Sequence, residues 1–363
     1  MTESLIPLGL ILAGLLALGA GGELLVRGAS KLAAAARITP LVVGLTVVAF
    51  GTSSPELAVS LDASLAGQTD IAVGNVVGSN IMNILFILGI SALVSPLTVS
   101  SQLIRLDVPL MIGASVLMLV LSSDGNIGRG DGGLLFGILV CYIVWTVWQS
   151  RRETSEARRQ FEQEYAVPER VSRRQVVRQI GLVLAGLVLL TLGAECLVDG
   201  ATAIARLLGM SELLIGLTIV ALGTSLPEVA ASVLATWRGE RDIAVGNVIG
   251  SNLFNILCVL GLSAAVSPQG IAVSAAALRF DIPVMIAVAT VCLPIFFTGQ
   301  RIARWEGGLF LGYYVAYTVY LVLSETDPAM SRTLGKVMWT AVLPLTAMTL
   351  LLSLCGALRH RRA

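Results

Sequence analysis

Residues Gly44–Glu56 read GLTVVAFGTSSPE, and residues Gly216–Glu228 read GLTIVALGTSLPE. Each stretch is an apolar run that ends in a single glutamate. The two glutamates stand 172 residues apart, close to half of the 363-residue chain. A charged residue has therefore been placed in the same apolar setting twice, which indicates an internal duplication.

A second block repeats at the same offset, as GNVVGSNIMNIL from Gly74 and GNVIGSNLFNIL from Gly246. Shorter matches extend the repeat further: Gly22-Glu23 pairs with Ala194-Glu195, Arg105–Pro109 with Arg279–Pro283, and Asp131–Gly133 with Glu306–Gly308. The duplication thus covers much of both halves of the chain.

The composition predicts a membrane protein. Hydrophobic residues make up 56% of the chain and charged residues 13%, and the mean hydropathy is +0.86, far more apolar than a soluble domain. The net charge of +1 gives no reason to expect a nucleic-acid partner. The bilayer is the expected surrounding, and no obligatory protein partner is evident. The first apolar segment follows Met-Thr-Glu-Ser without a basic region, so we expect a retained helix and not a cleaved signal.

The apolar runs favour an all-α polytopic fold, because each approaches the ~20 residues that span a bilayer as a helix and none alternates as a barrel strand would. About 11 helices are expected on this basis. The predicted segments are Leu5–Val26, Leu41–Ala66, Ile71–Val94, Leu103–Leu121, Gly133–Trp148, Ile180–Val198, Leu213–Ala235, Ile243–Val266, Ala277–Phe297, Gly307–Leu323 and Val337–Leu358.

One long polar stretch, Gln149–Arg178, predicts the topology. It carries eight arginines against five glutamates and should be cytoplasmic by the positive-inside bias. The N-terminus is then outside, and the C-terminus with its basic tail Arg359–Arg362 is cytoplasmic. The loops with Arg27, Lys31 and Arg37 and with Arg301 and Arg304 fall on the cytoplasmic side too. The short arginine-rich loops suggest a prokaryotic inner (plasma) membrane.

Each repeat spans five helices, an odd number, so the second copy enters the membrane inverted. We expect a first repeat over residues 1–149, a cytoplasmic loop over 150–178, a second inverted repeat over 179–324, and an additional C-terminal helix with a basic tail over 325–363. Inverted repeats are an architecture of secondary transporters, with the substrate site near the midplane where the repeats meet.

Two proline-containing motifs predict broken helices at that midplane. Pro55 and Pro227 remove a backbone donor, and the breaks are expected to free carbonyls about one turn upstream, near Ala49 and Ala221. Hydroxyl and amide oxygens accompany each glutamate. They belong to Thr52, Ser53, Ser79 and Asn83 in the first copy and to Thr224, Ser225, Ser251 and Asn255 in the second. Ser79 and Asn83, like their counterparts, share a helix face at i, i+4 spacing.

Two buried carboxylates need compensating charge, because an unpaired charge in the membrane costs several kcal/mol. Neither block contains a lysine or arginine, so bound cations or protons must supply it. Ligand sets made of oxygen alone favour calcium, sodium or both, whereas zinc prefers histidine or cysteine. The single histidine, His360, lies in the tail.

Several motifs have a plainer interpretation. The Gly-Thr-Ser-Pro kink alone is compatible with helix packing, and so are Gly74, Gly78, Gly246 and Gly250. Glu23 and Glu195 stand near helix ends, where they reach water or pair with a base such as Arg27. The five cysteines are expected to be free thiols packed as small hydrophobes. They are Cys141, Cys196, Cys258, Cys292 and Cys355.

Gly128-Arg-Gly-Asp131 matches the Gly-x-Gly-Asp pattern of intramembrane aspartyl proteases, but a surface turn is the stronger interpretation of this glycine-rich stretch. A serine protease using Ser53 would lack an embedded base. A sensor without transport would have no use for inverted broken helices. We therefore expect a transporter and not an enzyme.

The doubled motifs GTSSPE/GNVVGSNIMN and GTSLPE/GNVIGSNLFN resemble the alpha-1 and alpha-2 repeats of prokaryotic-type sodium/calcium exchangers in the cation/calcium exchanger superfamily. The resemblance covers both halves and leaves out the central loop and the last helix. It implies ten helices in two inverted repeats and a secondary antiporter that works by alternating access. It implies no cofactor, with Ca²⁺ and Na⁺ as the transported ions.

The resemblance also assigns ligands. It implies calcium binding by Glu56, Glu228, Thr52 and Thr224. It implies sodium sites from Ser53, Ser225, Ser79, Ser251, Asn83 and the carbonyls of Ala49 and Ala221, which share the glutamates.

Asn255 is an aspartate in some members, including potassium-dependent ones. As an amide it completes the sodium set here opposite Asn83 and argues against a potassium requirement. Proton/calcium exchangers typically carry Asn-Ala-Thr-Glu in place of Gly-Thr-Ser-Pro-Glu, so sodium is the expected counter-ion, and a proton/calcium antiporter stays the alternative.

Overall fold

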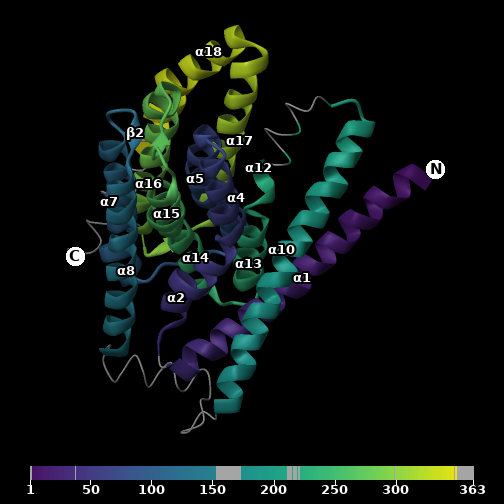
Figure 1. Ribbon diagram of the computed structural model, residues 1–363, viewed down its shortest axis with the longest axis vertical. Helices are drawn as coiled ribbons and strands as arrows, with labels where there is room; N and C mark the ends of the chain where they lie inside the picture. The colour runs from purple at the N-terminus through teal and green to yellow at the C-terminus, as the bar shows by residue number, and fades with distance from the viewer. Residues whose placement is uncertain are drawn as a thin grey trace.

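The computed structural model describes residues 2–36, 38–152, 173–210, 215, 219, 221–297, 299–346 and 348–349. Helices dominate it (Figure 1), which confirms the all-α polytopic fold. Among the described residues, eight helices are long and apolar enough to cross a membrane, or nine if one bent pair counts as a single span. The expected seventh and eleventh segments, the central loop and the tail lie partly or wholly outside the described residues, so the full helix count stays a prediction.

The first half contains the following helical elements, where η marks a π-helical turn: α1 (Thr2–Ala36), α2 (Pro40–Val43), η1 (Gly44–Val48), α3 (Ala49–Thr52), α4 (Ser54–Leu65), α5 (Thr69–Met82), η2 (Asn83–Leu88), α6 (Gly89–Val94), η3 (Leu103–Asp107), α7 (Val108–Leu121) and α8 (Arg129–Arg152). The second half contains α10 (Arg173–Leu207), α12 (Ala221–Gly223), α13 (Leu226–Trp237), α14 (Arg241–Phe254), η5 (Asn255–Leu260), α15 (Gly261–Val266), η6 (Ala277–Asp281), α16 (Ile282–Phe297) and α17 (Arg304–Thr326), followed by α18 (Pro328–Val337) and η7 (Met338–Val342).

The first helices of the two repeats, α1 and α10, cross each other along much of their length (Figure 1). Glycines let their backbones touch: a Cβ built at Gly14 would lie 2.7 Å from the Gly193 oxygen, and one at Gly21 2.8 Å from the Gly186 oxygen. The partner's number falls as the α1 number rises, so the helices are antiparallel. Equivalent helices that run in opposite directions are what an inverted duplication requires.

Both helices are longer than the sequence predicted. Each has 35 residues, because α1 continues beyond Val26 through the alanine-rich stretch Ala33–Ala36 and α10 begins before Ile180 at Arg173. Alanine and arginine are strong helix formers, so helical structure outlasts the apolar segment at these ends. Hydropathy alone marks only the part of a helix that crosses the hydrocarbon.

Two short ribbons tie the repeats together. Strand β1 (Leu97–Thr98) pairs antiparallel with β4 (Arg301–Ile302), and β2 (Asn126–Ile127) pairs with β3 (Ile271–Ala272). Each ribbon joins a loop of one half to a loop of the other. At the sequence offset of the repeat, β1 corresponds to β3 and β2 to β4, so the two ribbons are images of one another.

The centre of the molecule is built around α5 and α14. Every residue of α14 from Ile243 to Phe254 is buried. The first broken helix packs against it closely: a Cβ at Gly246 would lie 2.8 Å from the Leu41 oxygen, and one at Gly250 2.7 Å from the Leu45 oxygen. Gly246 and Gly250 are therefore packing positions, as the plainer interpretation held. At Gly74 and Gly78 a Cβ would meet nothing within 4 Å, so close packing does not explain them.

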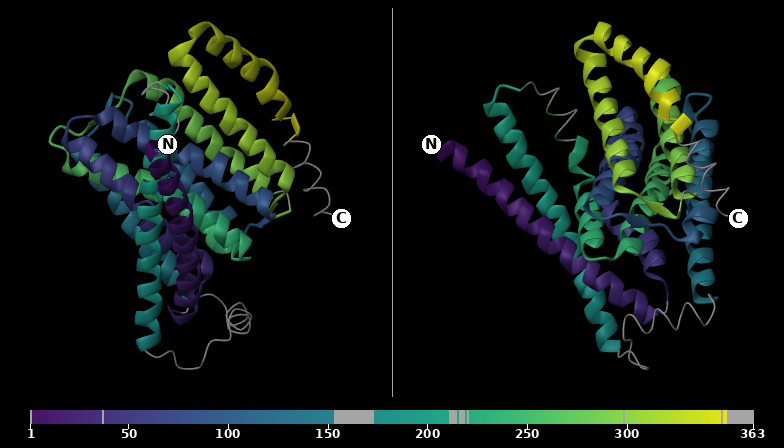
Figure 2. Two further views of the ribbon diagram at one scale, coloured as in Figure 1. Left: turned by 90° about the vertical axis from the view of Figure 1, so that its right-hand side faces the viewer. Right: turned by 180° about the vertical axis from the view of Figure 1, so that it is seen from behind.

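The loops agree with the predicted sidedness in one respect. The Thr39 N–H donates to Ser150 Oγ over 3.1 Å, so the first loop lies beside the end of α8 where Arg151 and Arg152 stand. At the other end of the chain, α18 folds back beside α17, the yellow helices of Figure 2. Tyr313 Oη lies 2.5 Å from Thr346 Oγ1. The additional C-terminal segment thus packs on the second repeat.

Candidate functional site

Both proline motifs interrupt their helices in the same way. In the first copy the segments Pro40–Thr52 and Ser54–Leu65 are bent by 45° about Ser53, whose φ and ψ are −82° and 7°. In the second copy α13 begins after Ser225, with φ −90° and ψ 4°. Since each proline lacks an N–H and stands in the first turn of the following helix, the break falls just before it. The predicted breaks are confirmed.

Glu56 and Glu228 lie one residue after these prolines and are 0% and 1% exposed. Their contacts cross between the repeats. Ser53 Oγ donates to Glu228 Oε1 over 3.1 Å, and Ser225 Oγ donates to Glu56 Oε1 over 3.0 Å. Ser225 also lies 3.2 Å from Ser79 Oγ. The two glutamates, predicted to converge, thus belong to one polar cluster.

A Thr–Asn–Ser chain flanks each glutamate. Thr52 Oγ1 lies 3.1 Å from Asn247 Oδ1, whose amide nitrogen donates to Ser232 over 2.9 Å. In the equivalent Thr–Asn–Ser chain of hydrogen bonds, Thr224 Oγ1 lies 3.5 Å from Asn75 Oδ1. Asn75 Nδ2 donates to Ser60 over 2.9 Å and to the Glu56 carbonyl over 3.1 Å.

The sequence analysis did not single out Asn75, Asn247, Ser60 or Ser232. The sequence nevertheless marks them: Asn75 and Asn247, like Ser60 and Ser232, stand 172 residues apart, and both asparagines lie inside the repeated GNV blocks.

Four asparagines meet between α5 and α14. Asn83 and Asn255 open the π-helical turns η2 and η5, so both follow directly on the regular helix that carries Ser79 or Ser251. Their amides donate across the repeats, to Asn252 and to Asn80. π-helical turns are common at functional sites. Asn80 and Asn252, which also recur at 172 residues, were missed by the sequence analysis.

Several buried oxygens of this cluster accept or donate no hydrogen bond within the described part of the chain. They are Glu56 Oε2, Glu228 Oε2, Asn83 Oδ1, Asn255 Oδ1 and Ser251 Oγ. Neither glutamate forms a salt bridge with a described residue. Buried polar atoms are normally satisfied, so a symmetric set of unsatisfied oxygens indicates a ligand. The negative charge of the two carboxylates needs a cation or proton to neutralise it, and hard oxygens suit calcium and sodium.

No soft-metal cluster competes with this site: among the described residues no three His, Cys, Asp or Glu side chains gather as a metal site would require. The carbonyl of Ala49 is less free than expected, since it accepts the Ser53 N–H at 2.9 Å and the Thr52 hydroxyl at 3.4 Å. Both of its lone pairs thus face protein donors, and its role as an ion ligand stays a prediction. Ala221 is the first residue of α12.

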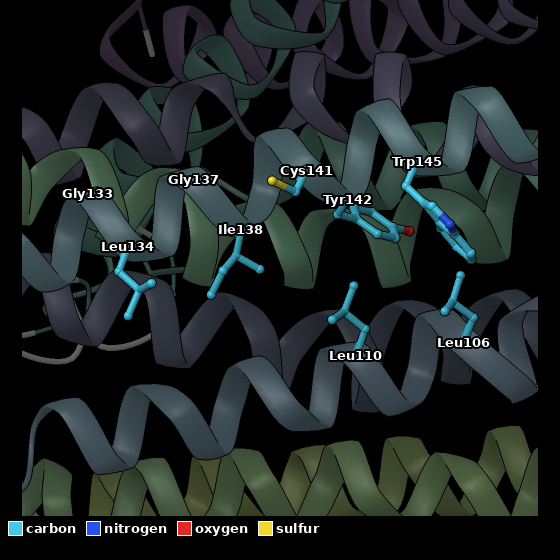
Figure 3. A pocket seen from close by; sticks show the side chains of 9 residues that line it. All are labelled: Leu106, Leu110, Gly133, Leu134, Gly137, Ile138, Cys141, Tyr142 and Trp145. Atoms are coloured by element: carbon cyan, nitrogen blue, oxygen red, sulfur yellow. The ribbon is translucent and has the colours of Figure 1, made fainter.

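A separate groove of about 750 Å³ runs between η3–α7 and α8 (Figure 3). It is lined by Leu106, Leu110, Gly133, Leu134, Gly137, Ile138, Cys141, Tyr142 and Trp145. This lining contains no charged side chain, in contrast to the cluster around Glu56 and Glu228. Beside it, Tyr142 donates to the buried Asp107 over 2.9 Å, and Tyr317 donates to Asp281 over 3.4 Å in the second repeat.

The remaining acidic candidates lie elsewhere. Asp131 accepts from the Gly128 N–H over 2.9 Å in the first turn of α8, as a capping residue does, which supports the surface-turn interpretation. Glu23 forms ion pairs with Arg27 and Arg238. Glu195 is exposed. None of them joins the cluster around Glu56 and Glu228.

Comparison with known proteins agrees with this architecture. The sequence model for the sodium/calcium exchanger protein family matches residues 6–148 and 178–323. The putative antiporter CaxA of Alkalimonas amylolytica is 40% identical over 87% of this chain and 98% of its own length. The sodium/calcium exchanger MaX1 of Methanosarcina acetivorans is 33% identical over 86% and 97%.

A solved structure of the sodium-calcium exchanger NCX_Mj, soaked without Na⁺ and Ca²⁺, superimposes with a TM-score of 0.75 at 31% identity and covers 87% of this chain and 99% of its own. The inner membrane protein YrbG of Escherichia coli is 38% identical over 87% of this chain and 97% of its own. With both halves matched and the fold shared, the chain is a multi-pass membrane protein that belongs to the sodium/calcium exchanger family of cation antiporters.

Proposed function

We propose that the chain exchanges calcium for sodium across an inner membrane at the site formed by Glu56 and Glu228. One observation carries the proposal. Two buried carboxylates each have one oxygen bonded to a serine of the opposite repeat and one oxygen without a partner among the described residues. Such a pair carries about two negative charges in a low-dielectric setting and needs cations to neutralise them.

Calcium and sodium would satisfy the pair in different ways. One Ca²⁺ takes both carboxylates together with Thr52 and Thr224. Sodium ions instead share the carboxylates one by one. The remaining ligands of the sodium ions, taken together, would be oxygens of Ser53, Ser225, Ser79, Ser251, Asn83, Asn255 and the Ala49 and Ala221 carbonyls. Competition for the same carboxylates makes occupancy exclusive, and exclusive occupancy couples the two fluxes.

The cost of the empty site enforces that coupling. Moving two unpaired carboxylates through a closed, dry intermediate costs several kcal/mol per charge. Reorientation therefore requires a loaded site. Under this proposal residues 1–149 and 179–324 act as the two inverted repeats, and each contributes one glutamate.

The burial of the two Thr–Asn chains supports access from one side. Asn75 and Thr224 are half-buried, whereas Asn247 and Thr52 are 1% and 0% exposed. Asn75 lies near the start of α5, which follows a loop that the arginine distribution places outside. We therefore assign the structure to a state open to the outside, with the N-terminus outside and the C-terminus cytoplasmic.

The decisive experiment is uptake of calcium-45 into proteoliposomes under a sodium gradient or a proton gradient, applied separately. We expect uptake with sodium and a loss of at least about a hundredfold in Glu56→Gln, because the change removes one charge of the buried pair. Glu195→Gln is the matched control: it removes an exposed glutamate of α10 that lies outside the cluster around Glu56 and Glu228. Uptake driven by protons alone would support the proton/calcium antiporter instead, and retained exchange in Glu56→Gln would exclude this site.

A further inference from the structure

The four asparagines between α5 and α14 form a directional network. Asn83 Nδ2 donates to Asn252 Oδ1, and Asn255 Nδ2 donates to Asn80 Oδ1, both over 3.1 Å. All four side chains are at most 2% exposed. An amide side chain has a donor end and an acceptor end, so a flip would exchange them. What fixes the direction of these amides decides which end faces a bound ion.

A methionine fixes the direction on one side. Asn252 Nδ2 lies 3.3 Å from Met111 Sδ, and a thioether sulfur only accepts hydrogen bonds. The end of Asn252 at Met111 must therefore be the NH₂, which leaves its Oδ1 toward Asn83. Asn83 must in turn present its NH₂ to Asn252. Its own Oδ1 is then the end without a protein partner, as observed.

The image side has the same logic with one addition. Asn80 Nδ2 lies 3.5 Å from Met285 Sδ and also donates to the Asn252 backbone oxygen over 3.3 Å. Both neighbours are acceptors, so Asn80 presents its Oδ1 to Asn255 and leaves Asn255 Oδ1 free. Two acceptors thus fix the orientation of the Asn80 amide, whereas one acceptor among the described residues fixes that of Asn252.

We infer that Asn80, Asn252 and Met111 are positioning residues that hold Asn83 and Asn255 with their carbonyl oxygens available to cations. The inference rests on the proposed function, because it assigns a role within the same site. Groups that orient the ligands without touching the ion commonly have a large effect on the affinity for the metal. Met111 alone fixes Asn252 and through it Asn83. Met285 fixes Asn80, and through it Asn255, together with a backbone carbonyl.

Because Asn80 has two acceptors that fix its amide and Asn252 has one, the two methionines can be compared in a matched test. Met111→Leu and Met285→Leu make the same volume-conserving change at two equally buried positions, 1% exposed each. In equilibrium binding of calcium-45 to the purified full-length protein, Met111→Leu should raise the half-saturating calcium concentration by about threefold to tenfold, the effect of one buried hydrogen bond. Met285→Leu should change it by less than about twofold, because the backbone acceptor still fixes Asn80.

A second measurement separates positioning from general packing. The effect of Met111→Leu should vanish in an Asn83→Ala background and persist in an Asn255→Ala background, since the relay ends at Asn83. Wild-type protein that binds neither calcium nor sodium would defeat the proposed function itself. Wild-type binding combined with equal effects of the two leucine variants, or with a Met111→Leu effect that survives Asn83→Ala, would overturn the relay alone.

Discussion

At the scale of single residues, the site is held together by exchange between the repeats. Each serine at a helix break bonds to the glutamate of the other copy and not to its own, at 3.0 and 3.1 Å. Each glutamate therefore accepts a serine hydroxyl of the opposite repeat at its Oε1. Hydrogen bonds to a charged acceptor are stronger than neutral ones, so this crossing also stabilises the contact between the halves.

This arrangement predicts a coupling that sequence neighbours would not show. Ser53→Ala and Glu228→Gln should be non-additive in the ion-free protein, with a coupling of about 1 kcal/mol, because both changes weaken the same bond. Ser53→Ala and Glu56→Gln should add, although these residues are three apart in sequence. Unfolding curves of the three single variants, the two double variants and the parent would measure both terms. Equal coupling in the two pairs would contradict the crossed geometry.

At the scale of elements, glycines define how the helices meet. Along α1 the residues Gly14, Gly21 and Gly28 contact the backbone of α10 directly, and a Cβ at any of them would lie 3.0 Å or less from α10 atoms. Small residues at such spacing let membrane helices approach closely, and packing replaces the missing hydrophobic drive in lipid. The pair thus forms a unit in which the two backbones approach closely at the glycines.

Enlarging one of these glycines should separate the pair. Gly14→Val should lower stability by about 1–3 kcal/mol, because its new Cβ meets the Gly193 carbonyl and the Leu197 backbone. It should also slow exchange, since the α1–α10 contact is distorted. Gly9→Val and Gly19→Val are controls on the same helix, where a Cβ meets nothing within 4 Å. Unfolding midpoints and transport rates for all three test this, and loss in the controls would show that α1 tolerates no valine at all.

The sequence predicted these elements unevenly, for physical reasons. Long apolar runs and repeated Pro-Glu motifs located the broken helices and both glutamates. Charged and helix-breaking residues are rare in helices that span the hydrocarbon core, so they stand out in the sequence. It did not show the π-helical turns at Asn83 and Asn255, which depend on local backbone geometry with no compositional signal. It also missed Met111 and Met285, since a methionine in an apolar helix is indistinguishable from packing until its neighbour is known.

At the scale of the whole molecule, the two halves are alike in sequence and unlike in exposure. The chain formed by Thr52 and Asn247 is buried, and the image formed by Thr224 and Asn75 is half-buried. The difference extends along the helices that carry them: α14 is buried throughout its centre, whereas Gly74 in α5 is exposed. The surroundings of the two Thr–Asn chains thus differ in exposure.

Cysteine labelling should report this difference. In a background without the five native cysteines, Thr224→Cys should react with a membrane-impermeant thiol reagent at least about ten times faster than Thr52→Cys, because a buried thiol is protected from solvent. Right-side-out vesicles without calcium or sodium should show the faster reaction. A faster reaction in inverted vesicles would reverse the assigned orientation, and equal rates at both positions would contradict the asymmetry.

The half-burial of one Thr–Asn chain has a consequence for the conformation that is not seen. Under the proposed alternating access, the two repeats, which share a sequence pattern and run in opposite directions, would take on each other's shape when access is reversed. Exchanging the conformations of the halves would bury Asn75 and Thr224 and uncover Thr52 and Asn247. Under this proposal one structure of an inverted duplicate describes both end states of the cycle, and distances between the Thr–Asn chains and their flanking helices become expected values for the inward-facing form.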